Sequence, residues 1–180
     1  HIMIKILNFF VLLTFFQHSG FSQEKAFVNP VNIDSLINQS RRLNEWHLDS
    51  SIILAKRAAK MAGEINYLRG AGNAFFELGY CMDRKGKYEQ GIEYYSKALK
   101  IKLQIGDSSA GSAMGEIGHA YRKLGRMEDA LKSFQMAIEI AKKYNDSGVI
   151  CNNTHRIGIL YQRKGDLKNA MSMYEEALRI

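Results

Sequence analysis

The sequence predicts an all-α protein, a right-handed solenoid of about four stacked antiparallel helical hairpins. Its 180 residues are 46% hydrophobic, an ordinary share for a folded domain, and include a single proline. The low proline content favours helices over a turn-rich β fold. The third observation is an internal repeat, because similar segments centred on Gly79, Gly118 and Gly158 follow one another at spacings of 39 and 40 residues.

The N-terminus differs from the rest and is typical of a secretory signal peptide. Lys5 precedes an apolar run at 6–16, and the small residues Gly20 and Ser22 follow it. The run is about half the length that a membrane span needs. We therefore expect residues 1–22 to be a signal peptide and the protein to be exported to the periplasmic or extracytoplasmic side. Residues 23–33, with Pro30, are expected to form an extended linker.

Residues 34–180 carry the repeat, and we expect hairpins at about 34–65, 66–105, 107–145 and 146–180. In each clear copy, a second glycine follows the first by seven residues and an aromatic residue follows it by sixteen. The first glycine should allow close helix contact, and the second should end the first helix. The predicted packing positions are Leu78, Gly79, Ile117, Gly118, Ala130, Phe134, Ala137, Ile157, Gly158, Tyr161, Ala170, Tyr174 and Ala177.

The first hairpin matches the repeat weakly. Ile52 and Ala59 fall at the two alanine positions of the second helix, but Lys56 stands where the other copies have an aromatic residue. Asp-Ser pairs mark where helices should begin, because an Asp side chain can accept a hydrogen bond from the first helical N–H groups. The expected capping residues are Asp34, Asp49, Asp107 and Asp146.

This pattern resembles the tetratricopeptide repeat, whose copies place an aromatic residue, Leu-Gly, Tyr, Ala, an aromatic residue and Ala at the same offsets. The resemblance covers about residues 66–180. Two features depart from it: the period exceeds the usual 34 residues, and Leu103 and Lys142 replace the proline that often closes a copy. The resemblance implies a non-catalytic module that binds proteins or peptides.

Exported chains of this kind resemble the input regions of bacterial sensor histidine kinases and regulators. Because the sequence stops at Ile180 inside the last expected helix, we expect the natural protein to continue. If it is the input region of such a sensor, a membrane span and a signalling domain would follow the repeats. The alternative is a periplasmic scaffold or assembly adaptor without a signalling role. Any contact with the membrane is expected only through the signal peptide or such a downstream span.

The residues suggest no chemistry of their own. The sequence lacks phosphate-binding, nucleophile-elbow and His-Glu-x-x-His motifs, so we expect no catalytic residues, cofactor or metal. Cys81 and Cys151 belong to hairpins too far apart for a disulfide and should be free packing residues, with an intermolecular bridge as the alternative. The net charge of +7 is spread along the chain, which together with export argues against nucleic acid as a partner.

The resemblance also implies a concave groove lined by the first helix of each hairpin. Its residues would make the groove mildly basic, suited to an extended acidic peptide or a C-terminal carboxylate. An ordinary solvated polar face is the alternative interpretation, and self-association is left open. The candidate groove residues are Asn73, Phe76, Tyr80, Arg84, Ser112, His119, Arg122, Lys123, Asn152, His155 and Arg163.

Overall fold

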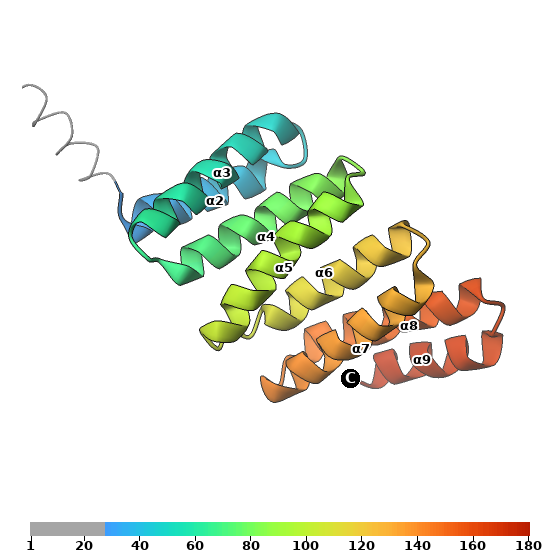
Figure 1. Cartoon of the computed structure of the whole chain (residues 1–180). Coiled ribbons are helices and arrows are strands. Elements are labelled where there is room, and N and C mark those ends of the chain that lie inside the picture. Colours follow the sequence, from blue (N-terminus) through green and yellow to red (C-terminus); the bar gives the residue numbers. More distant parts are fainter. Residues whose placement is uncertain (1–27) are drawn as a thin grey trace, which may run out of the picture.

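The computed structural model describes residues 28–180, which form eight α-helices and no strand. Antiparallel pairs of these helices make four hairpins that stack side by side (Figure 1). The predicted signal peptide lies outside the described residues. In chain order the helices are α2 (Pro30–Leu43), α3 (Leu48–Glu64), α4 (Leu68–Arg84), α5 (Tyr88–Gln104), α6 (Ala110–Lys123), α7 (Met127–Lys143), α8 (Ser147–Arg163) and α9 (Leu167–Arg179).

Each hairpin packs against the next through its second helix, so that α3 contacts α4, α5 contacts α6 and α7 contacts α8. The first helices also approach one another, α2 with α4 and α6 with α8, whereas the second helices make no comparable contact within residues 28–180. The first helices therefore line the inner side of the stack. This arrangement is the predicted solenoid, with its inner face built from α2, α4, α6 and α8.

The repeat glycines lie where the two helices of a hairpin come closest. A Cβ atom added at any of the three would lie 2.5 to 2.7 Å from a ring carbon of the aromatic residue in the second helix. A side chain there would collide with the ring, so glycine is required by packing. The register predicted from the sequence is confirmed in the pairs Gly79–Tyr95, Gly118–Phe134 and Gly158–Tyr174.

The second glycine of each clear copy ends the first helix, as predicted. Gly86, Gly125 and Gly165 have φ angles of 71°, 76° and 79°, in the left-handed region that glycine adopts without a steric penalty. The turn between α2 and α3 has no such glycine and is one residue longer than the three later turns within hairpins.

That longer turn shifts the register of the first hairpin. Counted from the start of each 17-residue helix, the residues of α3 that match Ala130, Phe134 and Ala137 are Ser51, Ala55 and Ala58, all fully buried. The predicted register of Ile52, Lys56 and Ala59 was therefore wrong by one residue. The spacings taken from the three later copies do not apply to the first hairpin, because its turn is one residue longer.

The start of the first hairpin also differs from the expectation. Residues 23–33 were expected to be extended, but α2 begins at Pro30, which fits the first helical position because it needs no N–H partner there. Asn29 caps this helix by accepting a hydrogen bond from the Asn32 N–H at 2.9 Å. Asp34 lies inside α2 and accepts a hydrogen bond from the Tyr67 hydroxyl instead of capping.

The other predicted caps have mixed outcomes. Asp146 caps α8 as predicted, because its carboxylate accepts from the Val149 N–H at 3.0 Å. Asp49 lies in the first turn of α3 and pairs with Lys85. The carboxylate of Asp107 accepts from the backbone and hydroxyl of Ser109, just before α6 begins, and so shapes the turn without capping the helix.

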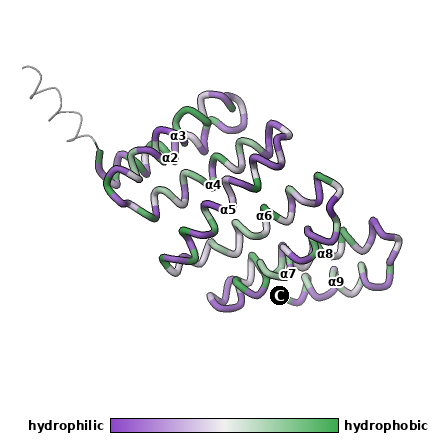
Figure 2. The backbone as a smooth tube through the Cα atoms, viewed as in Figure 1, coloured by the Kyte–Doolittle hydropathy of each residue, from purple (hydrophilic) through white to green (hydrophobic). Residues whose placement is uncertain are grey.

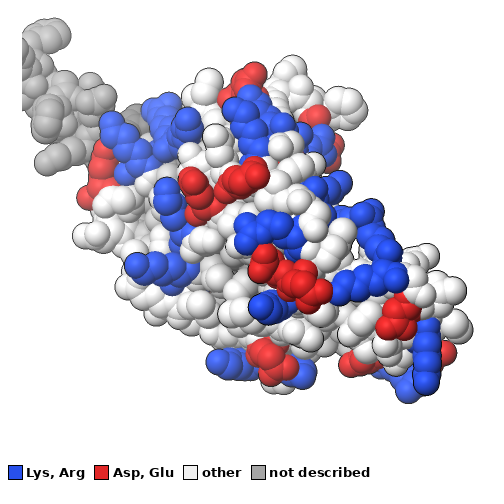
Figure 3. Space-filling view, turned by 45° about the vertical axis from the view of Figure 1, so that its right-hand side comes forward, with Lys and Arg blue, Asp and Glu red and all other residues white. Residues whose placement is uncertain are grey.

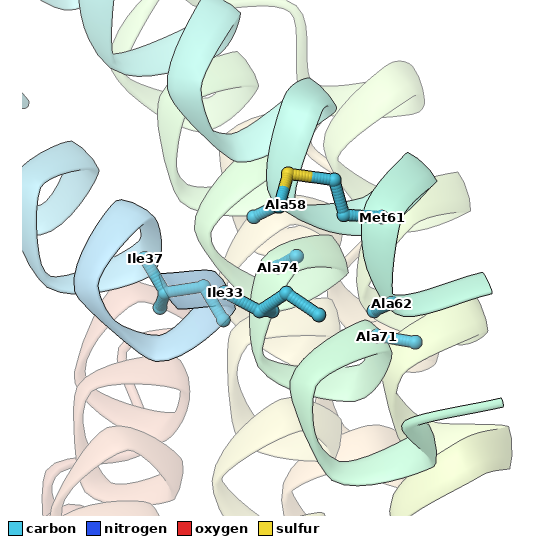
Figure 4. Packing of buried hydrophobic residues seen from close by; sticks show 7 residues of the cluster. All are labelled: Ile33, Ile37, Ala58, Met61, Ala62, Ala71 and Ala74. Atoms are coloured by element: carbon cyan, nitrogen blue, oxygen red, sulfur yellow. The ribbon is translucent and has the colours of Figure 1, made fainter. Parts of the chain in front are cut away.

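The core lies between hairpins as well as within them. Polar and apolar stretches alternate along every helix (Figure 2), and buried apolar residues of neighbouring helices form shared clusters. The first cluster shows this, since α2, α3 and α4 all contribute to it (Figure 4). Its buried members are Ile33, Ile37, Ala58, Met61, Ala62, Ala71 and Ala74. A single hairpin could not bury these residues alone.

The two cysteines are free, as expected. Cys81 is buried between hairpins, and Cys151 is half-buried with its thiol against the Ala177 carbonyl. None of the helices between residues 28 and 180 has the length and apolar character needed to cross a membrane.

Candidate functional site

The inner face carries a recurring charged position that the sequence interpretation missed. Two residues before each repeat glycine stand Glu77, Glu116 and Arg156. These side chains link neighbouring first helices to one another instead of extending freely into a groove. Together with Arg41 of α2 they form two cross-hairpin ion pairs.

The first ion pair joins α2 to α4. Arg41 donates from Nε and Nη2 to one carboxylate oxygen of Glu77, at 2.9 and 2.7 Å, and the Glu77 side chain is almost completely buried. The second joins α6 to α8, where Arg156 contacts the Glu116 carboxylate at 2.8 Å and the Gly115 carbonyl at 3.0 Å. Both acidic charges are thus neutralised within the inner face.

A third link lies between these two and centres on His119 of α6. Arg122 donates to His119 Nδ1 at 3.4 Å, so the ring proton sits on Nε2, which lies 3.9 Å from the Asp83 carboxylate of α4. Burial lowers the pKa of His119 to about 4, with Glu116 acting in the opposite direction. Burial, helped by the nearby Glu116 charge, raises the pKa of Asp83. His119 is therefore a neutral hydrogen-bonding group at neutral pH.

Toward the start of α4, two predicted groove residues serve the core. Asn73 accepts a hydrogen bond from Lys102 Nζ at 2.8 Å, and the same ammonium donates to the Ser109 hydroxyl. The Phe76 ring packs edge-to-face against Tyr95, with centroids 5.4 Å apart. Burial lowers the pKa of Lys102, whose side chain is enclosed by these partners. These contacts join α4, α5 and the start of α6.

Two further predicted residues pack on other helices, Tyr80 on the next hairpin and His155 within its own hairpin. Tyr80 is half-buried in the apolar cluster that includes Met114 and Ile117 of α6. His155 lies against the Tyr174 ring of α9, with centroids 5.3 Å apart. It occupies the repeat position of Phe76, but α9 has no following hairpin beside it within the described residues.

The inner face is hollowed between α6 and α8. A shallow pocket of about 300 Å³ lies there, with the Glu116–Arg156 ion pair in its wall. Asn153 donates to the Val149 carbonyl, while its buried Oδ1 has no hydrogen-bond partner within the described part of the chain. The predicted residues Ser112 and Asn152 line this pocket, so the structure brings both together with groups that the sequence analysis did not name.

The remaining predicted residues, Arg84, Arg122, Lys123 and Arg163, lie at the C-terminal ends of α4, α6 and α8, and we call them the basic strip. No carboxylate oxygen of residues 28–180 lies within 4.0 Å of any of their charged nitrogens. Burial, with the nearby Arg163 and Arg156 charges, lowers the pKa of Arg122. Figure 3 shows Lys and Arg side chains gathered on the side where these helix ends come forward.

The inner face is therefore not uniformly basic. Its middle is balanced by Glu77, Asp83 and Glu116, and the surplus positive charge lies along one edge. The sequence did contain a signal for these residues, because a charged residue (Glu77, Glu116 or Arg156) stands two positions before each repeat glycine. Among residues 28–180, no group of three or more His, Cys, Asp or Glu side chains is placed to hold a metal ion. The arrangement suits polar contacts with a bound chain.

Comparison with known proteins identifies the repeat. The family model described as tetratricopeptide repeat matches residues 70–143 and 109–180, which together make up more than half of the chain. The comparison with curated proteins gives no significant match.

Solved structures share the fold. BtubC (BKLC) from P. vanneervenii has a TM-score of 0.74 at 21% sequence identity, over 89% of this chain and 68% of that one. The TPR-like repeats of a putative kinesin light chain from Podospora anserina have a TM-score of 0.68 at 16% identity, over 84% and 76% of the two chains. MamA has a TM-score of 0.63 at 16% identity, over 87% and 82%. At these identities the likeness concerns the fold alone.

Proposed function

Because the chain belongs to the tetratricopeptide repeat family, whose repeats serve protein–protein interaction, we propose that its inner face binds an extended segment of a partner protein and that the basic strip engages acidic residues of that segment. The observation that carries this proposal is the uneven charge of the inner face. Glu77 and Glu116 in its middle already pair with arginines, whereas the four cations of the strip have no carboxylate oxygen within 4.0 Å among residues 28–180, although the Asp83 charge acts on Arg122 and Lys123 from farther away.

The placement of the strip supports an extended ligand. Its members come from three successive hairpins, so only a chain that runs across those hairpins could contact all of them. Arg and Lys side chains form charge-assisted hydrogen bonds with carboxylates, which are stronger than neutral ones. The polar pocket between α6 and α8 adds amide and hydroxyl groups that suit the main chain or polar side chains of the same ligand.

The proposal can be tested by reversing charge at the strip. Lys123 and Arg163 are exposed, so Lys123→Glu with Arg163→Glu should leave the fold intact. Binding of a short fluorescent peptide rich in Asp and Glu, followed by fluorescence anisotropy, should weaken about tenfold or more, because two charge-assisted contacts become repulsive. The affinity of the unaltered protein should also fall as salt is added.

The matched control makes the same change in charge elsewhere. Lys56→Glu with Lys60→Glu alters two exposed cations of α3, a second helix that lies away from the inner face. This control should bind the acidic peptide nearly as well as the unaltered protein. If both variants lost the same affinity for the acidic peptide, net charge alone would explain the effect. If the strip variant bound the peptide as well as the unaltered protein, the basic strip would not be part of the binding site.

We also propose that this module acts outside the cytoplasm as the input region of a signalling protein. The support is the signal-peptide pattern of residues 1–22 followed by a binding module. A scaffold role without signalling is the competing proposal. The gene sequence that follows the codon for Ile180 separates them, since a membrane span and a kinase or DNA-binding domain favour signalling, and further repeats favour a scaffold.

A further inference from the structure

The fourth and fifth residues after each repeat glycine lie at equivalent places near the ends of three first helices. They are Asp83 and Arg84 in α4, Arg122 and Lys123 in α6, and Gln162 and Arg163 in α8. Four of them make up the basic strip, but the other two do not share its charge. The charges of each pair therefore cancel on the second hairpin, amount to two positive charges on the third and leave one positive charge on the fourth.

Asp83 causes this difference, and its carboxylate is not used within its own hairpin. In the fourth hairpin, Gln162 Oε1 accepts a hydrogen bond from the Tyr174 hydroxyl at 2.8 Å. Asp83 and Tyr95 occupy the same two repeat positions in the second hairpin, but the Asp side chain is one methylene shorter than Gln. The Tyr95 hydroxyl and Asp83 Oδ1 are both buried and have no hydrogen-bond partner among residues 28–180.

The next hairpin does not neutralise Asp83 either. Its Oδ2 lies 3.9 Å from His119 Nε2, and His119 is neutral at neutral pH because burial lowers its pKa to about 4. No Lys or Arg nitrogen of residues 28–180 lies within 4.0 Å of the Asp83 carboxylate, whereas Glu77 and Glu116 each contact an arginine. The Asp83 charge acts from farther away on Arg122, at the same offset in the third hairpin.

We propose that Asp83 determines where the acidic residues of the bound segment lie, because it disfavours a carboxylate over the second hairpin and so confines the acidic residues to the third and fourth hairpins. The proposal rests on the proposed function, and it makes Asp83 a specificity-determining residue of the same site. The preferred segment is then acidic over two hairpins and neutral or basic over the next.

The surroundings of Asp83 make its charge effective. The Asp83 side chain is 18% exposed, so water screens it less than an open surface group. Arg84, in the same hairpin, is exposed and more strongly screened. Hairpins stack about 10 Å apart, a distance that an extended chain covers in about three residues. A segment of about nine residues therefore passes over the three hairpins, with about three residues over each.

The first test removes the charge of Asp83 and keeps its shape. Asp83→Asn should bind the fluorescent peptide rich in Asp and Glu about threefold more tightly, because one nearby like charge is lost. Fluorescence anisotropy at pH 8, well above the ordinary carboxyl pKa, measures the affinity. Burial already favours the neutral form of Asp83 and raises its pKa, so this variant should fold. The gain should shrink as salt is added, whereas a change in structure alone would give a gain independent of salt and would overturn the proposal.

The matched control makes the same change in charge on a second helix. Glu139→Gln alters a carboxylate of α7 that is 69% exposed and lies away from the inner face, and it should bind the acidic peptide like the unaltered protein. An equal gain in the control would overturn the role of Asp83, because net charge would then explain the effect.

The second test varies the peptide. One peptide has about nine acidic residues, and two others carry glutamine in place of the acidic residues in the third nearest the N-terminus or the third nearest the C-terminus. The unaltered protein should bind at least one glutamine peptide as tightly as the all-acidic one, since the glutamines can lie over Asp83. Asp83→Lys should prefer the all-acidic peptide to both. The same order of affinities in the two proteins would overturn the proposal.

The two proposals fail in different ways. If Lys123→Glu with Arg163→Glu weakens peptide binding while Asp83→Asn and Asp83→Lys bind like the unaltered protein, the basic strip remains the site and the role of Asp83 is overturned. If the strip variant keeps full affinity, the proposed function fails and the role of Asp83 fails with it.

Discussion

At the scale of single residues, stability depends on contacts where one extra atom does not fit. Gly118 lies against Phe134, which is fully buried and has no room to turn away. Glycine in a helix costs about 1 kcal/mol relative to alanine. The close packing of α6 against α7, which a side chain at Gly118 would prevent, offsets this cost. The same reasoning explains why the sequence pattern around these glycines predicted the register of three hairpins.

Replacement of Gly118 by alanine should therefore destabilise the protein. The new Cβ would lie 2.7 Å from the Phe134 ring and 3.1 Å from Ser133 Cβ, and such overpacking typically costs about 1–3 kcal/mol. Urea unfolding measures the change. Gly63→Ala is the control, because no atom lies within 4 Å of the added Cβ, and it should raise stability by about 0.5–1 kcal/mol. A neutral Gly118→Ala would contradict the packing account.

His119 gives the fold a dependence on pH. Its pKa falls from 6.5 to about 4 on folding, so the unfolded chain takes up a proton first as the pH drops below 6.5. Stability should then decrease between pH 6.5 and pH 4, by an amount on the order of 1–3 kcal/mol, and should be unaffected by this group above that range. Unfolding of the protein and of His119→Gln, compared at pH 7 and pH 5, measures the effect.

The comparison with His119→Gln is needed because Asp83 titrates in the opposite sense. Its pKa is raised in the folded state, so protonation of Asp83 favours folding as the pH falls. The glutamine variant keeps Asp83 and loses only the histidine. Equal pH dependence of the two proteins would show that His119 is not held in its neutral form.

At the scale of helices, the ends are decided by local hydrogen bonds that differ from hairpin to hairpin. Asp146 caps α8 and Asp166 caps α9 by accepting from the N–H three residues later. Asp34 and Asp107 have the same side chain but bind Tyr67 and Ser109 instead. An Asp-Ser pair therefore predicted a helix start only approximately, because turn geometry decides which donor the carboxylate reaches.

The cap of α8 can be measured directly. Asp146→Ala removes the acceptor for the Val149 N–H and should lower the free energy of unfolding by about 0.5–2 kcal/mol. Asp146→Asn keeps an acceptor oxygen and should retain most of that stability. Thermal or urea unfolding at neutral pH measures both variants, and a loss in the asparagine variant as large as in the alanine variant would point to charge in place of capping.

At the scale of the whole molecule, the sequence was sufficient for the solenoid and insufficient for its inner face. The fold follows from glycine, alanine and aromatic residues at fixed offsets, which each copy repeats. The charge balance depends on pairs such as Arg41–Glu77 and Glu116–Arg156, whose partners are 36 and 40 residues apart. The type of a charged residue does not reveal such a partner, so Glu77, Asp83 and Glu116 were missed when the groove was predicted to be mildly basic.

The ion pairs between first helices also contribute to how the molecule would respond to a mechanical load. If a pull on the two ends straightens the stack, α2 moves away from α4 and α6 away from α8, so the Arg41–Glu77 and Glu116–Arg156 ion pairs must break, together with the packing of α2 on α4 in the first cluster. The apolar contact of α7 with α8 needs no change during this straightening. The resistance of the stack to straightening therefore comes from charged contacts on the inner face together with apolar packing between first helices.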